Sequence, residues 1–314
     1  MEAQYDSNTT GHYTGANLTI ISLIGLFALL FVFFKDKIAN ADNVAISLII
    51  LGIVSVSIIV LSAIIRKPIN KAIIQSIFIF GFFSFFYEFI SGFQLIIHNQ
   101  WQDNKLLAID ESLFGSEVSL IMQSIVSPYL TEAMMFAYVF YLPLLIIVAI
   151  VAYRRGAAKG LGEYLFILSS GYAICYIGFI LFPVASQMYY TPGQYNVALE
   201  GGVFTYLGEL MRSEAHFPGG NLPSPHCMAA TIMLYILFKH DRNLFYLFLP
   251  VTVLLYISTV YCRYHYMWDG VIAIALASML IKIFPIFKKI IYMFLLFRDS
   301  IMHPWCITES LLDN

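Results

Sequence analysis

The feature that most constrains this chain is a succession of apolar runs, each about as long as a membrane is thick. A helix needs about 20 apolar residues to cross roughly 30 Å of hydrocarbon, and runs of that length follow one another along most of the 314 residues. They predict an all-α, polytopic membrane helix bundle. We place eight crossings at residues 18–34, 44–65, 72–97, 131–153, 163–183, 226–239, 243–262 and 266–284.

Composition supports a membrane protein and argues against several other classes. The chain is 60% hydrophobic and only 11% charged, whereas a soluble domain carries about a quarter charged residues. Its formal net charge of −2 gives no reason to expect nucleic acid as a partner. The four cysteines are not spaced as zinc ligands or as a disulfide framework; they are Cys175, Cys227, Cys262 and Cys306.

Basic residues set the expected orientation, because cytoplasmic loops are enriched in Lys and Arg. Five of the seventeen lie on one side of the eight predicted helices: Lys35, Lys37, Lys105, Arg212 and Arg263. The other twelve predict a cytoplasmic side with both termini on it. Two long loops, 98–130 and 184–225, then face the periplasm, lumen or exterior. We expect the first to contain an amphipathic segment at the membrane surface, and the second to be a functional loop.

The second of these loops ends in a motif suited to binding an anion. Ser224 is a good helix N-cap and Pro225 suits the first helical position. His226 then lies in the first turn, where free backbone N–H groups and the helix dipole favour an oxyanion such as phosphate.

A second polar motif follows one helical hairpin later. His265 and Asp269 are four residues apart, so on a helix they share a face and the carboxylate can hold the imidazole. A single histidine at a membrane interface is often only a hydrogen-bonding residue. Two of them, each at the start of consecutive outward-facing helices, indicate a site for covalent phosphoryl transfer.

These two motifs resemble those of the type 2 phosphatidic acid phosphatase superfamily. Within it, the inositol phosphorylceramide synthase-like branch is similar in Phe182–Ala185, in Asp110 followed by Leu113–Gly115, and in Arg263–Tyr266 with Asp269. The resemblance covers roughly residues 105–285. It implies a six-helix catalytic core at 72–284, preceded by a tail (1–17) and two added helices (18–65) and followed by an interfacial segment (285–314).

The resemblance also implies a role for each motif residue. His265 would be the nucleophile that forms a phosphohistidine, with Asp269 fixing its tautomer. His226 would protonate the leaving oxygen and then activate the incoming hydroxyl. Ser224 would act as an N-cap, a phosphate contact or both. No metal and no cofactor is implied.

The chain departs from the superfamily pattern at its phosphate-binding cations. Thr259 stands where the phosphatases have an arginine six residues before the second histidine, and Ser186–Met188 lacks the arginine that often follows Phe-Pro in the branch. Arg263 and Arg212 are the arginines on the outer side, and we assign them to substrate binding.

The substrate expected from this pattern is a phospholipid or other lipid phosphate ester or diester, drawn from the membrane. Passing the phospho-headgroup to a lipid alcohol would make the protein a transferase, as in inositol phosphorylceramide synthase. Two alternatives stay open. With water as acceptor the protein would be a lipid phosphate phosphatase, and without catalysis it would be a lipid transporter or scramblase of the same fold.

Overall fold

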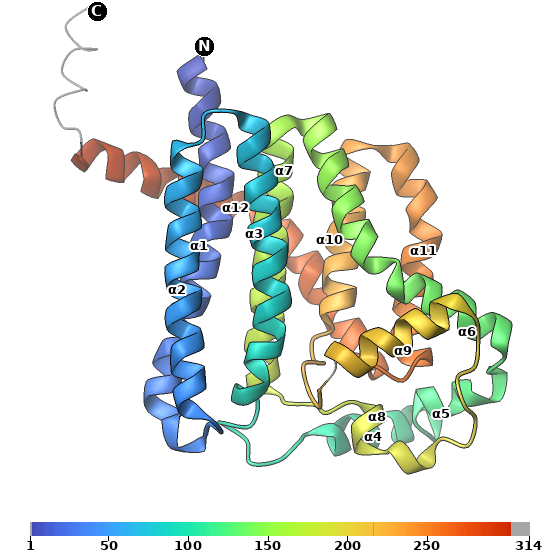
Figure 1. Ribbon diagram of the computed structural model, residues 1–314. Helices are drawn as coiled ribbons and strands as arrows, with labels where there is room; N and C mark the ends of the chain where they lie inside the picture. Colours follow the sequence, from blue (N-terminus) through green and yellow to red (C-terminus); the bar gives the residue numbers. More distant parts are fainter. Residues whose placement is uncertain (1, 216, 303–314) are drawn as a thin grey trace, which may run out of the picture.

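The computed structural model describes residues 2–215 and 217–302, and this part of the chain consists of helices and connections without a strand (Figure 1). In Figure 1 the long helices stand side by side, while most of the short ones gather at one end of the bundle. The long helices are α1 (Glu2–Phe34), α2 (Ala41–Ile64), α3 (Pro68–Phe89), α7 (Tyr141–Leu181), α10 (Pro225–His240), α11 (Arg242–Tyr261) and α12 (Met267–Met302). The short ones are η1 (Lys35–Lys37), η2 (Ile90–Phe93), α4 (Asp103–Phe114), α5 (Val118–Met122), η3 (Gln123–Ile125), α6 (Pro128–Val139), α8 (Gln187–Tyr190), η4 (Pro192–Gln194) and α9 (Val203–Ala215).

Helix α7 is a hairpin of two arms rather than one straight rod. Its backbone leaves the helical region at Ala157, with φ 50° and ψ −154°. Tyr164 donates a hydrogen bond to the carbonyl of Leu145 at 3.3 Å, and the hydroxyls of Tyr141 and Tyr172 are hydrogen-bonded. Both pairs join residues on opposite sides of the turn, and the pair nearer to it in sequence lies inside the other, so the arms run antiparallel (Figure 1).

Six described helices are long and apolar enough to cross a membrane: Tyr13–Lys37, Ala41–Ile64, Pro68–Phe93, Tyr141–Leu181, Arg242–Tyr261 and Met267–Ile290. The predicted runs 131–153 and 163–183 fall on the two arms of α7, the first beginning in α6. The predicted run 226–239 is α10, which has 16 residues and is the shortest of the long helices. The eight predicted segments therefore map onto these six helices, the second arm of α7 and α10.

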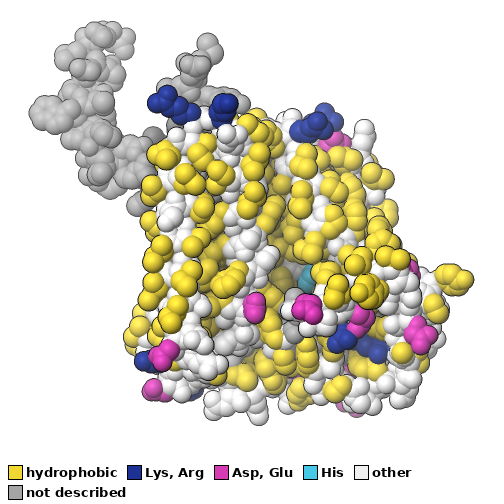
Figure 2. Space-filling model, viewed as in Figure 1, with side chains coloured by type: hydrophobic (Ala, Val, Ile, Leu, Met, Phe, Trp, Pro, Cys, Tyr) yellow, Lys and Arg dark blue, Asp and Glu magenta, His cyan; other side chains and the backbone are white. Residues whose placement is uncertain are grey.

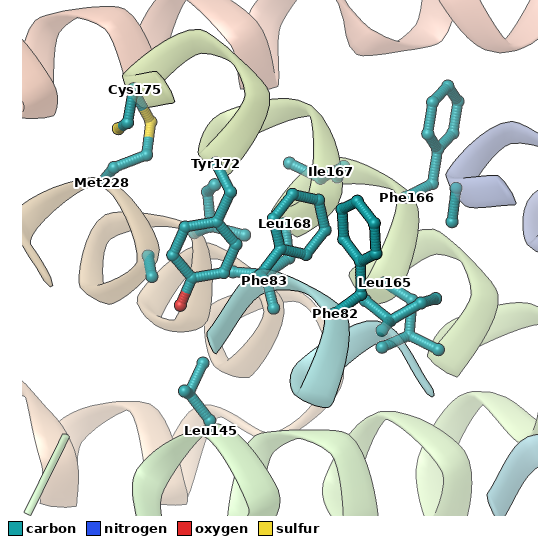
Figure 3. Packing of buried hydrophobic residues seen from close by; sticks show 14 of the residues in the cluster. Phe82, Phe83, Leu145, Leu165, Phe166, Ile167, Leu168, Tyr172, Cys175 and Met228 are labelled. Carbon is teal, nitrogen blue, oxygen red and sulfur yellow. The ribbon is translucent and has the colours of Figure 1, made fainter. Parts of the chain in front are cut away.

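The second arm of α7 lies at the centre of the bundle and packs against α1, α3 and α10. Figure 3 shows Leu168 and Tyr172 of α7 beside Phe83 of α3, and Cys175 of α7 beside Met228 of α10. In the most apolar stretch of α7, 67% of the residues are buried, against 17% in α2. α7 is thus the core helix, and α2 is the helix most open to its surroundings.

The outer surface of the bundle is apolar over much of its height. Ile49, Ile53 and Val60 of α2 are each more than half exposed, which water would disfavour but lipid would not. Figure 2 shows this apolar surface between an end that carries Lys and Arg and an end with more Asp and Glu. The predicted all-α polytopic bundle is confirmed, and the protein is an integral, multi-pass membrane protein.

Two expected boundaries differ from the helices observed. α1 begins at Glu2, so residues 2–17, which the sequence suggests to be a tail, belong to the same helix as the first membrane crossing. No proline interrupts the helix between these residues. α12 continues through Pro285 to Met302, since a proline inside a membrane helix is tolerated when neighbouring groups satisfy the freed carbonyl. Of the predicted segment 285–314, residues 303–314, including Cys306, lie outside the described residues.

Short helices occupy both of the long loops identified in the sequence. The segment 98–130 forms α4, α5 and η3, and the segment 184–225 contains α8, η4 and α9. α9 has an exposed apolar stripe formed by Val203, Tyr206 and Leu210, as expected for a helix lying along a membrane surface.

Candidate active site

The first motif is held at the start of α10 as the sequence predicts. Ser224 has an extended backbone, and its Oγ accepts a hydrogen bond from the N–H of Cys227 at 3.4 Å, which confirms it as the N-cap. Pro225 occupies the first turn, and the partly exposed His226 follows it. An N-cap of this kind stabilises a helix by about 1 kcal/mol, and it fixes where the His226 side chain leaves the backbone.

The second motif lies in the tight connection from α11 to α12. The N–H groups of Tyr264 and His265 both donate to the carbonyl of Thr259, at 3.1 and 2.9 Å, and Arg263 adopts a left-handed φ of 66°. α12 starts at Met267, so His265 precedes the helix instead of lying within it. The turn directs His265 back toward the bundle.

Asp269 links the helix start to the histidine. Its Oδ2 accepts from the backbone N–H of Tyr266 at 3.0 Å and lies 3.3 Å from Nδ1 of His265. His265 is 2% exposed and Asp269 is fully buried. Because the carboxylate occupies Nδ1, the opposite ring nitrogen, Nε2, is the one available for chemistry.

The structure brings the two motifs together. The ring centroids of His226 and His265 are 5.7 Å apart, with the ring planes at 65°. The N–H of Ser224 donates to the backbone carbonyl of Asp269 at 3.0 Å, which ties the start of α10 to the start of α12. A Cβ added at Gly270 would lie 3.2 Å from the sulfur of Cys227, so these helix starts are in close contact.

The two arginines assigned to substrate binding contact residues of the segment 184–225. The guanidinium group of Arg263 donates to the carbonyl of Val197 at 2.6 Å and lies 4.1 Å from the centroid of the Tyr195 ring. Partial burial lowers the pKa of Arg263, while Tyr195 acts in the opposite direction. Arg212 of α9 forms an ion pair with Glu209, and its Nη1 lies 3.8 Å from the sulfur of Met188.

Sequence reasoning missed Asp103, a fully buried carboxylate of α4 that supports the second motif. It accepts from the N–H groups of Ala185 and Ser186 at 2.8 and 3.1 Å, and from the hydroxyl of Tyr266 at 3.0 Å. Burial raises the pKa of Asp103, and these hydrogen bonds oppose that rise. The only signal in the sequence is a carboxylate on an otherwise amphipathic segment.

Two further side chains outside the motifs brace the same region. Gln187 donates from Nε2 to the carbonyl of His265 at 2.9 Å. Gln94 accepts at Oε1 from the N–H of Gly220 at 2.6 Å, and Gly219 and Gly220 have positive φ angles of 108° and 70°. The Gly-Gly turn therefore needs residues without a Cβ to reach the start of α10.

A cavity of about 380 Å³ reaches His226 from the bundle. No Lys, Arg, Asp or Glu is among its lining residues, which come from α3, α6, α7, α9 and α10. They are Phe80, Phe83, Ser84, Tyr87, Tyr138, Tyr141, Leu142, Leu145, Ile146, Tyr172, Tyr176, Met211, Pro225 and His226. A histidine thus lies at the boundary between a polar helix start and an apolar, aromatic space.

These features define a class: a polytopic membrane helix bundle with a paired-histidine site where its membrane helices meet the short helices at one end of the bundle. The chain belongs to the PAP2 superfamily, whose family model matches residues 104–283, more than half of the chain. The matched region begins in α4 and ends in α12, so α1, α2 and α3 lie outside it. Membership indicates lipid phosphate phosphatase or phosphotransferase activity, with lipid phosphates as substrates. No curated protein and no solved structure matches the chain.

Proposed function

We propose that this protein is a lipid phosphotransferase or phosphatase of the membrane that works through a phosphohistidine on His265. The observation that supports this most directly is the paired geometry of the site. The His226 and His265 rings are 5.7 Å apart, and Asp269 holds Nδ1 of His265.

In the first half-reaction, Nε2 of His265 attacks the phosphorus of the lipid phosphate. The new P–N bond forms as the bond from phosphorus to the leaving oxygen breaks, and His226 gives that oxygen a proton. Asp269 accepts from Nδ1–H throughout, which stabilises the positive charge that develops on the ring. In the second half-reaction His226 takes the proton of the incoming hydroxyl, whose oxygen attacks phosphorus as the P–N bond breaks.

The phosphate oxygens are proposed to lie at the start of α10, near Ser224. There the backbone N–H groups and the helix dipole stabilise negative charge without a metal ion. Arg263 and Arg212 remain proposed phosphate ligands, and to act as such Arg263 would exchange its hydrogen bond to Val197 for one to substrate. A diester, with one negative charge, suits this supply of cations better than a monoester dianion.

We propose transfer to a lipid alcohol as the reaction, on the resemblance to the inositol phosphorylceramide synthase-like branch. The alcohol could be ceramide, diacylglycerol or a polyprenol. Hydrolysis is the second candidate, because the same phosphohistidine yields a phosphatase when water is the acceptor. A lipid transporter or scramblase is a third, favoured by the absent arginines at Thr259 and Ser186–Met188 and opposed by the intact site.

The test is to incubate purified protein with labelled phospholipids, with and without ceramide or diacylglycerol, beside His265→Ala. A new labelled lipid that appears only with an acceptor supports transfer. Free phospho-headgroup or inorganic phosphate without an acceptor supports hydrolysis instead. Product formed equally by His265→Ala would contradict the phosphohistidine, and labelled lipid that only changes leaflet would support the transporter.

A further inference from the structure

The aromatic surroundings of His226 are not accounted for by the two motifs. Tyr138, the penultimate residue of α6, stacks on the His226 ring with centroids 4.7 Å apart and planes at 29°. Tyr141, the first residue of α7, lies against the same ring at 4.7 Å with planes at 51°. The two tyrosines are three residues apart across the junction of the helices, so both point to one side.

Each tyrosine is itself fixed by a second contact. The Tyr141 hydroxyl is hydrogen-bonded to that of Tyr172 on the other arm of α7. The Tyr138 ring lies 4.5 Å from the ring of Tyr264, the residue before His265. Tyr138 is 1% exposed and Tyr141 is also buried, so neither ring can move without disturbing the packing around it.

A ring face attracts a cation, and the attraction is stronger where water is excluded. The cavity beside His226 has no charged lining residue, so the tyrosine faces are well placed to stabilise an imidazolium. We propose that Tyr138 and Tyr141 are positioning residues that clamp His226 and favour its protonated form, the form needed to protonate the leaving oxygen. This proposal rests on the proposed role of His226 as general acid.

Other groups around His226 also bear on its protonation. His265 faces it from the connection before α12 and is itself held by Asp269, and the cationic form of His265 would oppose a second positive charge nearby. Other titratable groups on the elements packed around it include Tyr87 and Glu88 of α3, Glu132 of α6, Tyr172 and Tyr176 of α7, Glu209 and Arg212 of α9, Cys227 of α10 and Tyr264. The rings that pack on His226 at 4.7 Å are those of Tyr138 and Tyr141.

The clamp is tested by following the protonation of His226 directly. Protein labelled with ¹⁵N-histidine in nanodiscs is titrated by NMR, and the His226 signal is assigned with His226→Gln. Tyr141→Leu should lower the titration midpoint by about 1 pH unit, since a desolvated cation–π contact and one unit of pH correspond to similar free energies. Tyr141→Phe keeps the ring and should restore the midpoint.

Tyr176→Leu is the matched control, because Tyr176 is buried and lines the same cavity but its ring pairs with Phe83, Phe86, Tyr172 and Phe179. The titration midpoint of His226 in Tyr176→Leu should equal that in the wild type. Tyr138→Leu provides a second reading if Tyr141→Leu does not fold. The proposed clamp would be wrong if the His226 midpoint did not change in Tyr141→Leu or Tyr138→Leu, or if it changed by the same amount in Tyr176→Leu. The titration needs no substrate, so it tests the clamp separately from the enzymatic activity. A wild-type protein without turnover on any lipid phosphate would count against the proposed function.

Discussion

At the scale of single residues, the proposed chemistry depends on the Asp269 carboxylate, which keeps a proton on Nδ1 of His265. Asp269 approaches Nδ1 of His265 and also accepts from the N–H of Tyr266, so it holds the ring and the chain entering α12 together. Replacing the carboxylate by an amide keeps the shape and removes the charge. The effects of Asp269 and His265 on the reaction can therefore be separated.

Asp269→Asn should lower kcat on the order of 10²- to 10⁴-fold while the protein stays folded, because the imidazolium that develops on His265 loses its counter-charge. His265→Ala should lose the phosphoenzyme altogether. Both are measured by single-turnover kinetics and by trapping of acid-labile, histidine-linked phosphate. A phosphoenzyme of normal yield in His265→Ala would place the nucleophile elsewhere.

Arg263→Gln should raise KM and lower kcat if its guanidinium group binds phosphate. Lys37→Gln is the matched control, because Lys37 is another cation predicted on the same side as Arg263, and it donates to a backbone carbonyl, that of Ile96, at 2.9 Å. Its kinetic constants should match those of the wild type. Kinetics of Arg263→Gln that also match the wild type would remove Arg263 from the site and leave it a structural role through its contacts with Val197 and Tyr195.

A metal-independent reaction should survive chelation. Turnover measured after dialysis against EDTA should stay within about twofold of the untreated protein, because nucleophile, acid and anion site are all supplied by the chain. A loss that a divalent cation restores would contradict this and would require a metal in the phosphate site.

At the scale of elements, the start of α10 is placed by a close approach to α7. A Cβ at Gly178 would collide with the ring of Pro223 and lie 3.0 Å from the carbonyl oxygen of Leu222. The turn that leads to Ser224 and His226 can therefore dock only against a glycine.

Gly178→Ala should push this turn away, lower kcat at least tenfold and lower the unfolding temperature, since overpacking costs about 1–3 kcal/mol. Gly81→Ala is the control, because a Cβ at this glycine of α3 meets nothing within 4 Å. Kinetics and thermal unfolding are measured for both in the same detergent. Equal behaviour of the two variants would mean that the turn can shift at no cost.

The elements also show which parts of the site were predictable. The N-cap at Ser224 and the pairing of His265 with Asp269 were predicted because both depend on residues within four positions of each other. Asp103, Gln187 and the Tyr138 ring were not predicted. They reach the histidine motifs from helices and loops far away in sequence, and nothing local distinguishes such residues from others of their type.

At the scale of the whole molecule, hydrophobicity predicted the bundle because each crossing must satisfy its backbone within the lipid. Hydrophobicity located the two arms of α7, although helical structure runs up to Ala157 from one side and resumes directly after it on the other. It did not locate the start of α1, since residues 2–17 are too polar to stand out as a membrane run. The packing of α1 against α7 supplies contacts that a pattern along one helix cannot reveal.

The distribution of charge predicts the orientation of the bundle, and the orientation determines which compartment the site faces. The α2–α3 connection, the turn within α7 and the α10–α11 connection lie at one end of the bundle (Figure 1), and Arg155 and Lys239 form ion pairs there with Asp241 and Glu163. The site lies toward the other end of the bundle, near the short helices α4, α8 and α9. By the positive-inside rule, we expect the end with these basic residues to be cytoplasmic and the site to open outward.

Two exposed positions test this orientation in intact cells: Gly193→Cys at the end near the site and Arg154→Cys in the α7 turn. Cys306 is first replaced by serine, and the buried Cys175, Cys227 and Cys262 serve as internal negatives. A membrane-impermeant maleimide should label Gly193→Cys in intact cells, and Arg154→Cys only after the membrane is opened. A reporter fused near residue 205 should likewise be external. The reverse pattern would turn the bundle over and give the site cytoplasmic lipid phosphates as its substrates, because only headgroups of the leaflet that it faces can reach His226 and His265.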